Sequence, residues 1–220
     1  TGELFLGHLR YGTFGGNTIE QCHPFLRQSN WKTRNLVLAG NFNMTNVDEL
    51  FQQLVDLGQH PKQKADTVTI LEKIGHFLDE ANDDIYYKHN DKFSKKQITQ
   101  VIEDEIDVQD ILTQSAKYWD GGYVMCGLMG HGDAFALRDP NAIRPAYYYK
   151  DDEIVVVASE RSVIQTSFDV NIEDVKEIKA GHALIIKKDG RVEEKQVREP
   201  LERKSCSFER IYFSRGNDAG

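Results

Sequence analysis

The sequence predicts an α+β fold with layered antiparallel sheets. Strand-like apolar runs stand near the start, a helical block occupies the middle, and short strand-like runs separated by turn residues fill the second half. The chain lacks the regular strand–helix alternation of a parallel sheet, and elements segregated in this way are typical of the α+β class. With 220 residues, the chain is long enough for one large domain or two small ones.

The first part of the chain predicts two strands joined by a loop. Residues 3–11 are rich in Leu and Phe and read as a strand, and three of residues 12–16 are glycine, which suits a loop. Pro24 then fixes a bend. Residues 35–39 predict the second strand, which leads into an Asn-rich elbow at residues 40–46.

The middle of the chain predicts helices from caps and from apolar periodicity. Asn46 with Glu49 forms a capping-box pattern, and Gly58 ends that helix. Further helices are expected to begin at Asp66, Ser94 and Asp107. Residues 79–93 are acidic and polar, which indicates a solvated connection or an insertion.

The second half predicts strands of hairpin type. Gly, Asp, Pro and Asn residues separate the apolar runs, which favours an antiparallel meander with one short helix at residues 159–166 and a final hairpin. The expected meander strands are residues 123–129, 134–138, 143–149 and 154–158, and the hairpin strands are residues 182–187 and 191–197.

Composition excludes several classes of partner. The 35 acidic and 27 basic residues give a formal charge of −8, and the basic residues are scattered, so nucleic acid and anionic membranes are poor partners. No apolar run approaches the roughly 18 residues of a spanning helix, and no signal pattern opens the chain. The three Cys residues are far apart and form no Cys-x-x-Cys pair, which argues against a disulfide framework and a zinc site. We therefore expect a soluble, cytoplasmic protein.

The candidate nucleophiles each have a simpler explanation. Thr1 at a chain terminus can use its own amine as a base, but a cut sequence explains that terminus equally well. Cys22 adjoins His23, yet neighbours in an extended segment point to opposite sides, so a structural Cys is favoured. Cys126 lies in an apolar run and is expected in the core.

Polar residues at the ends of strands and helices are candidates for binding. Arg10 ends a strand beside a glycine-rich loop and is able to hold a carboxylate with two hydrogen bonds, or else forms a surface salt bridge. Asp66 is either a helix cap or a partner for a substrate ammonium. The segment 36–46 resembles a strand that ends in a polar elbow, which is able to present backbone N–H groups and an amide for catalysis or simply forms a capped corner.

A series of motifs, taken in order, resembles a known family. The motifs are Gly-His-Leu-Arg-Tyr-Gly-Thr (7–13), His-Pro-Phe (23–25), Ala-Gly-Asn-Phe-Asn-Met-Thr-Asn (39–46), Ala-Asp-Thr (65–67), Trp-Asp-Gly-Gly-Tyr (119–123), Leu-Arg-Asp-Pro-Asn-Ala-Ile-Arg-Pro (137–145), Ala-Ser-Glu-Arg (158–161) and Cys-Ser-Phe-Glu-Arg-Ile-Tyr-Phe-Ser-Arg (206–215). Together they resemble the glutaminase domain of the amidophosphoribosyltransferase family, which are class II glutamine amidotransferases. The segment 206–213 separates this family from other members of the class.

The resemblance implies an αββα four-layer sandwich of the N-terminal-nucleophile type. In that family a terminal Cys attacks the glutamine amide and its own α-amine acts as the base. By motif position, Asn41 would donate its side-chain amide to the oxyanion and Phe42 its backbone N–H. Arg10 would bind the substrate α-carboxylate and Asp66 its α-ammonium, with Thr13 near the same end.

The chain departs from the family pattern at several positions. Gly12, Ala65 and Ala142 replace a Ser, a Ser and a Gly, and we expect all three to be tolerated. Phe42 stands where the family usually has Gly, so a backbone with positive φ would be strained there by about 1–2 kcal/mol.

None of the three Cys residues occupies the nucleophile position, because the family Cys lies upstream of the motif at residues 7–13. Residues 1–220 are therefore expected to be a partial glutaminase domain, incomplete at its N-terminal strands, without the phosphoribosyltransferase domain. We expect no cofactor, no metal site and no iron–sulfur cluster in this chain, and any magnesium would accompany phosphoribosyl pyrophosphate in the absent domain.

The resemblance also implies an activity for the parent protein. The parent would use ammonia from glutamine to convert phosphoribosyl pyrophosphate to phosphoribosylamine in purine synthesis, and would be a homo-oligomer, whereas this chain alone would be inert. Two alternatives remain: a non-catalytic module that binds an amino acid or a protein, and a class II glutaminase domain with another acceptor domain. The aromatic segment 208–213 argues against the latter.

Overall fold

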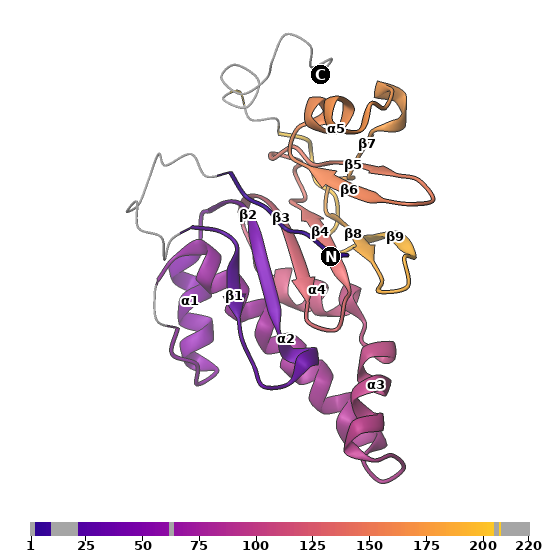
Figure 1. Cartoon of the computed structure of the whole chain (residues 1–220). Coiled ribbons are helices and arrows are strands. Elements are labelled where there is room, and N and C mark those ends of the chain that lie inside the picture. Colours follow the sequence, from indigo (N-terminus) through magenta and orange to yellow (C-terminus); the bar gives the residue numbers. More distant parts are fainter. Residues whose placement is uncertain (1–2, 10–21, 62–63, 205–206, 208–220) are drawn as a thin grey trace.

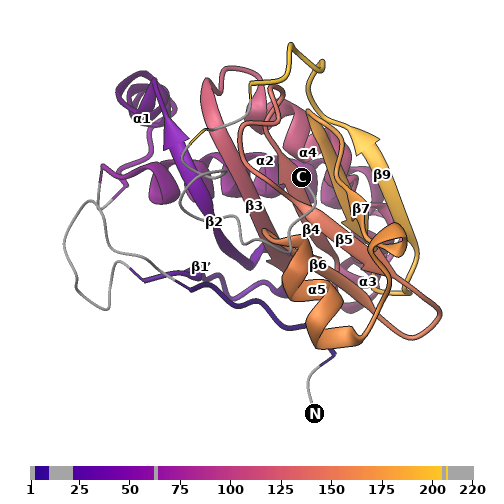
Figure 2. The same ribbon diagram turned by 90° about the horizontal axis from the view of Figure 1, so that it is seen from above.

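Helices and sheets stack in four layers in the computed structural model, which describes residues 3–9, 22–61, 64–204 and 207. A helical layer covers one face of a large sheet, a small sheet covers part of the other face, and one helix lies outermost (Figure 1). Figure 2 shows the same stacking from above. The helical layer contains α1 (Val47–Asp56), α2 (Asp66–His89), α3 (Lys95–Glu105) and α4 (Val108–Ala116), and the outer helix is α5 (Arg161–Phe168). The αββα sandwich expected from the resemblance is confirmed.

Both sheets are antiparallel throughout. The large sheet has the order β1-β2-β3-β4-β8-β9, and the small sheet has the order β6-β5-β7. The large sheet consists of β1 (Phe25–Arg27), β2 (Leu36–Met44), β3 (Gly121–Met129), β4 (Ala134–Arg138), β8 (His182–Ile186) and β9 (Val192–Gln196), and the small sheet of β5 (Tyr147–Lys150), β6 (Val155–Ala158) and β7 (Lys176–Glu177). Short 3-10 helices, η2 (Lys32–Arg34) and η3 (Ile172–Asp174), lie in the connections.

The large sheet separates two apolar cores, because successive side chains of a strand point to opposite faces. Tyr123 and Met125 of β3 are fully buried on the helical side, in the larger core. Val124 and Cys126 of the same strand pack in the smaller core between the two sheets. Both sets of alternating side chains are apolar because both faces of β3 are covered.

The polar segment 79–93 is not a solvated connection, since α2 continues to His89. Ile85 packs against the larger core on the same face of α2 as the buried Leu78, about two helical turns further along. The acidic residues stabilise the other face, where Asp79 accepts from Arg27 Nη2 at 2.6 Å. A long helix with one narrow apolar stripe and many charges reads as polar until its partners are known.

The predicted meander is wrong as a single sheet. Strand β4 pairs with β8, and the next strand, β5, belongs to the small sheet. The turn between β4 and β5 causes this change, because the buried Asp139 accepts hydrogen bonds from the backbone N–H groups of Asn141, Ile143 and Arg144 at 3.0–3.1 Å. The predicted hairpin near the end of the chain is confirmed by the pairing of β8 with β9.

Two predictions near the beginning of the chain are also wrong. Residues 3–9 form no strand, while residues 10–11 of that predicted strand lie outside the described residues. Asn46 does not cap α1 with its side chain, because its Nδ2 donates to Tyr118 O at 2.8 Å. By contrast, Ser94 N donates to Gln97 Oε1 at 3.0 Å, which confirms the capping box of α3.

Candidate functional site

The Asn-rich segment after Ala39 continues a strand rather than forming an elbow. Strand β2 extends to Met44, and Asn41 and Phe42 lie opposite Val124 and Tyr123 of β3. The predicted corner is therefore wrong, although the residues that it contained remain together at one end of the large sheet.

Asn41 and Phe42 present different groups because they alternate along β2. Asn41 is exposed and shares its face with Val124, which packs in the core between the sheets. The Phe42 ring lies on the helical side, packed against the larger core. Phe42 is not among the residues with positive φ, so the strain considered for this position does not arise.

The outer edge of β2 is held by two side chains from other elements. Gly40 N donates to His23 Nδ1 at 3.1 Å, and Met44 N donates to Asp66 Oδ2 at 3.2 Å. Strand β1 pairs with β2 only as far as Leu38. In the described part of the chain, these side chains therefore replace a neighbouring strand at this end of the edge.

The Phe42 N–H is directed toward the same edge. Backbone groups of an antiparallel strand alternate between its two neighbours. Thr45 N donates to Asp120 O at 2.9 Å on the β3 side, whereas Gly40 N and Met44 N donate on the opposite side. Phe42 has the parity of the latter two, so its N–H lies between two N–H groups that are already bound.

Asp66 lies in the first turn of α2, where a carboxylate interacts favourably with the helix dipole. Its side chain is partly buried, and its contact with Met44 places it beside the end of β2. The structure thus brings together three of the five predicted site residues, Asn41, Phe42 and Asp66. The predictions for Arg10 and Thr13 fall outside the described residues.

His23 is a component of this region to which we assigned no role, although it opens the His-Pro-Phe motif at 23–25. Its Nε2 lies 3.2 Å from Thr67 Oγ1, and its ring stacks on that of His8 with centroids 4.4 Å apart. The sequence signal was the His-Pro-Phe motif, in which Pro24 fixes a bend immediately before β1.

Cys126 is a poor candidate for a nucleophile. Burial raises the pKa of the Cys126 thiol to about 11, which leaves almost no thiolate near neutral pH. Cys22 is exposed, and neither of the two is in a disulfide. The prediction that Cys126 is a core residue is confirmed by its place between the sheets.

Two residues of the motif at 137–145 hold the backbone rather than face the candidate site. The buried Arg138 donates to Arg144 O and Ile178 O, both at 2.7 Å, and forms an ion pair with Glu177 at 2.7 Å. Asp139, at 0% exposure, is the acceptor described above for the turn after β4. The sequence signal for Asp139 is the Asp-Pro-Asn run, because Asp side chains in turns accept hydrogen bonds from nearby backbone N–H groups.

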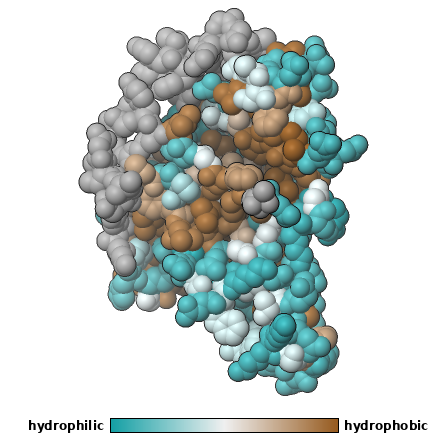
Figure 3. Space-filling model, viewed as in Figure 1, coloured by the Kyte–Doolittle hydropathy of each residue, from teal (hydrophilic) through white to brown (hydrophobic). Residues whose placement is uncertain are grey.

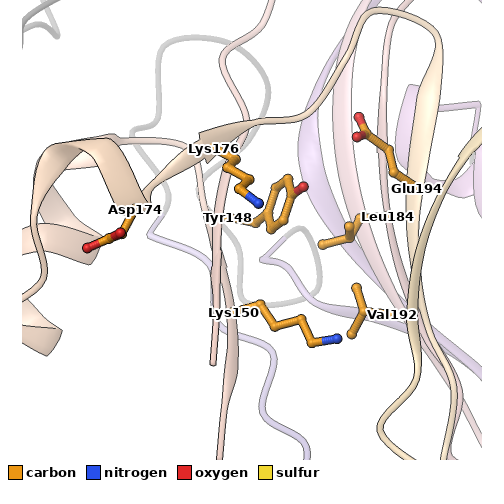
Figure 4. A pocket seen from close by; sticks show the side chains of 7 residues that line it. All are labelled: Tyr148, Lys150, Asp174, Lys176, Leu184, Val192 and Glu194. Carbon is orange, nitrogen blue, oxygen red and sulfur yellow. The ribbon is translucent and has the colours of Figure 1, made fainter. Parts of the chain in front are cut away.

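The described residues also form a cavity of about 170 Å³ between the two sheets, away from β2 (Figure 4). Its lining residues are Tyr148, Lys150, Asp174, Lys176, Leu184, Val192 and Glu194. The two lysines and the two carboxylates balance in charge, which gives no preference for an anion or a cation. Among the described residues, no cluster of three or more His, Cys, Asp or Glu is arranged to hold a metal, and no helix is long and apolar enough to cross a membrane.

Comparisons with known proteins give a consistent relationship. The chain is 29% identical over 220 residues to the amidophosphoribosyltransferase of Pasteurella multocida, and 30% identical over 217 residues to that of Bacillus subtilis. Each match covers 97% of this chain and 39% or 38% of the relative, so the chain spans about two fifths of their length. No family model matches the sequence.

Solved structures agree with the sequence relatives. The chain resembles the glutamine phosphoribosylpyrophosphate amidotransferase of B. subtilis, solved with ADP and GMP, at a TM-score of 0.67 and 26% identity, over 94% of this chain and 38% of that one. A second structure, described as the allosteric regulatory enzyme of purine biosynthesis, matches with a TM-score of 0.67 and 27% identity, over the same shares of the two chains. The chain is therefore a relative of the amidophosphoribosyltransferases over nearly its whole length, and it has the fold of their glutaminase domain.

Proposed function

We propose that this chain is the larger part of the glutaminase half of an amidophosphoribosyltransferase, which releases ammonia from glutamine for transfer to phosphoribosyl pyrophosphate in purine synthesis. The observation that carries the proposal is the end of β2, where an exposed amide, Asn41, stands beside the outward-directed N–H of Phe42. Two adjacent donors on a rigid strand are suited to the oxyanion of an acyl-transfer reaction.

In this mechanism, a cysteine upstream of the residue 7–13 motif attacks the glutamine amide carbon, and its α-amine takes the thiol proton. Negative charge then develops on the amide oxygen, which accepts from Asn41 Nδ2 and Phe42 N–H. The protonated α-amine passes its proton to the amide nitrogen, the C–N bond breaks and ammonia leaves. Water then hydrolyses the thioester through a second oxyanion at the same position, which releases glutamate and the thiol. Because the two donors are fixed before the reaction, little reorganisation opposes charge development.

We assign the α-amino and α-carboxylate groups of the substrate to Asp66, beside the end of β2, and to Arg10 and Thr13. Asp66 Oδ2 accepts from Met44 N, which leaves the other carboxylate oxygen for the α-ammonium. A carboxylate at this position attracts a cation. By motif position, we assign Arg10 to the α-carboxylate and Thr13 to the same end of the substrate. The parent also contains the phosphoribosyltransferase domain, where magnesium accompanies the pyrophosphate substrate, and acts in the cytoplasm as a homo-oligomer.

The Asn41→Ala variant tests the oxyanion assignment in the chain extended upstream through the cysteine. We expect kcat for glutamate release to fall by about 100- to 1000-fold, because one oxyanion donor is lost, with little change in KM. Asn43→Ala is the matched control: Asn43 lies on the same face of β2, is also exposed, and should retain activity within about threefold.

Retention of kcat in Asn41→Ala would contradict the assignment of this donor. Absence of turnover in the extended wild-type chain would overturn the function itself, and calorimetric binding of glutamine in that case would identify a non-catalytic module. We expect the 220-residue chain alone to release no ammonia.

A further inference from the structure

We propose that His23 is a positioning residue that fixes the backbone of β2 around the Phe42 N–H, an inference that rests on the proposed function. It acts through hydrogen bonds to the strand and to α2, not through contact with the reacting atoms.

The first step concerns the part of the outer edge of β2 that has no neighbouring strand among the described residues. Beyond Leu38 the described part of β1 no longer pairs with β2. Among the described residues, the partner recorded for Gly40 N is the His23 imidazole, at 3.1 Å from Nδ1. Gly40 is partly buried, and a buried N–H without a partner costs about 1–3 kcal/mol, so this contact helps to fix the edge.

The second step concerns the tautomer. Because Nδ1 accepts from Gly40 N–H, it carries no proton, and the ring proton of neutral His23 is on Nε2. Nε2 then donates to Thr67 Oγ1 at 3.2 Å, in the first turn of α2. One imidazole thus connects β2 to the helix that carries Asp66, which holds Met44 N on the other side of Phe42.

The third step concerns the rigidity of the ring. The His23 ring stacks on His8, contacts Phe25 edge-on with centroids 5.0 Å apart, and lies 5.9 Å from the ring of Phe42. Aromatic contacts on several sides fix both the position and the rotation of the imidazole. The Phe42 N–H is therefore held between two anchored N–H groups, and loss of the His23 anchor would allow it to move by a fraction of an ångström or more.

Two substitutions separate hydrogen bonding from packing. His23→Phe keeps an aromatic ring but removes the acceptor, whereas His23→Gln retains an acceptor for Gly40 N–H and a donor for Thr67. In the chain extended through its cysteine, we expect His23→Phe to lower kcat by about 100-fold, the cost typical of a misplaced group. KM should change by less than about threefold, and His23→Gln should restore most of the loss. His60→Phe, at an exposed histidine in the loop after α1, is the control and should retain full activity.

Nuclear magnetic resonance of the 220-residue chain provides a readout that does not depend on activity. We expect His23 to be the neutral tautomer with the proton on Nε2, and exchange of the Gly40 amide hydrogen to accelerate at least about tenfold in His23→Phe but not in His23→Gln, because only the former leaves that N–H unbound. Far-ultraviolet circular dichroism and a thermal midpoint check that both variants fold.

The possible results are distinguishable. A proton on Nδ1, or Gly40 exchange that is equal in His23→Phe and wild type, overturns the proposal whatever the activities are. Equal losses of kcat in His23→Phe and His23→Gln would assign His23 a packing role only and would also overturn it. If the extended wild-type chain has no glutaminase activity, the proposed function fails, and the tautomer and exchange data still decide whether His23 anchors the strand.

Discussion

Ala142 adopts a left-handed backbone, with φ of 49°, in the turn that leads from the large sheet to the small one. Its N–H donates to Asp139 O at 3.1 Å, and the residue is only 6% exposed. We expected an Ala to be tolerated at this position, and the turn is indeed formed. A side chain in this conformation nevertheless costs about 1–2 kcal/mol.

The Ala142→Gly variant should raise the free energy of unfolding by about 0.5–1 kcal/mol. Relief of the strained backbone outweighs the greater entropy that Gly contributes to the unfolded chain. Urea denaturation measures the change. Ala146→Gly is the control, because Ala146 is buried but is not among the residues with positive φ, and it should destabilise the protein. Lower stability in Ala142→Gly would contradict the assignment of strain.

Arg27 of β1 forms ion pairs with α2, and its side chain passes over the helix at Gly75. Arg27 forms ion pairs with Glu72 at 3.2 Å and with Asp79 at 2.6 Å, and its side chain is 19% exposed. A Cβ at Gly75 would overlap the Nε and Cδ atoms of Arg27. Gly75 therefore provides the space in which the guanidinium reaches both carboxylates.

A double-mutant cycle tests this arrangement, because the effect of Gly75→Ala on stability should change sign when Arg27 is removed. Gly75→Ala alone should lower stability by about 1–2 kcal/mol, because displacement of a partly buried ion pair outweighs the gain in helix propensity. In the Arg27→Ala background, the same change should raise stability by about 1 kcal/mol, because only the propensity remains. Denaturation of the four proteins gives the coupling energy, and additive effects would show that Gly75 does not accommodate Arg27.

At the scale of the whole molecule, the stability of the fold toward acid depends on the buried carboxylate of Asp133. This residue lies in the turn between β3 and β4 and contacts the residues that follow β8. Asp133 is fully buried, lies 3.2 Å from His131 Nε2, forms an ion pair with Lys187 and accepts from Lys188 N at 2.9 Å. Burial by itself would raise the pKa of Asp133, but these partners lower it to about 2.

This lowered pKa predicts how stability changes with pH. The pKa of Asp133 in the folded state is below its value of 3.8 in the unfolded state, so its contribution is complete above about pH 4 and is lost as the pH falls to about 2. The loss amounts to about 2 kcal/mol. Urea denaturation between pH 5 and pH 2 should therefore show a shallower decline for Asp133→Asn than for the wild type. Parallel curves would contradict the lowered pKa.

The two sheets differ in width, which leaves part of the large sheet's inner face without a covering strand among the described residues. Figure 3 shows apolar side chains gathered in the middle of the viewed face, between the region of the small sheet and that of the helices. Leu26 of β1, at 58% exposure, is one of the exposed apolar residues of the described chain. Asn41 lies on this same inner face, where the oxyanion is assigned.

Sequence alone was sufficient for features that depend on neighbouring residues. The capping box at Ser94, the start of α4 at Asp107 and the pairing of β8 with β9 follow from local caps, periodicity and a turn, which act over a few residues. The ordered motifs also identified the relationship to the amidophosphoribosyltransferases and singled out Asn41 and Phe42 as candidate site residues.

Tertiary structure decided the features whose partners are remote in the chain. Arg27 and Asp79 are 52 residues apart, and their contact explains why an acidic stretch remains helical in α2. The direction of the Phe42 N–H depends on which edge of β2 is paired with β3, and the proposed role of His23 depends on its contact with Gly40. The physical reason is that a strand's own sequence sets the alternation of its side chains, whereas its neighbours determine which backbone groups are left for a substrate.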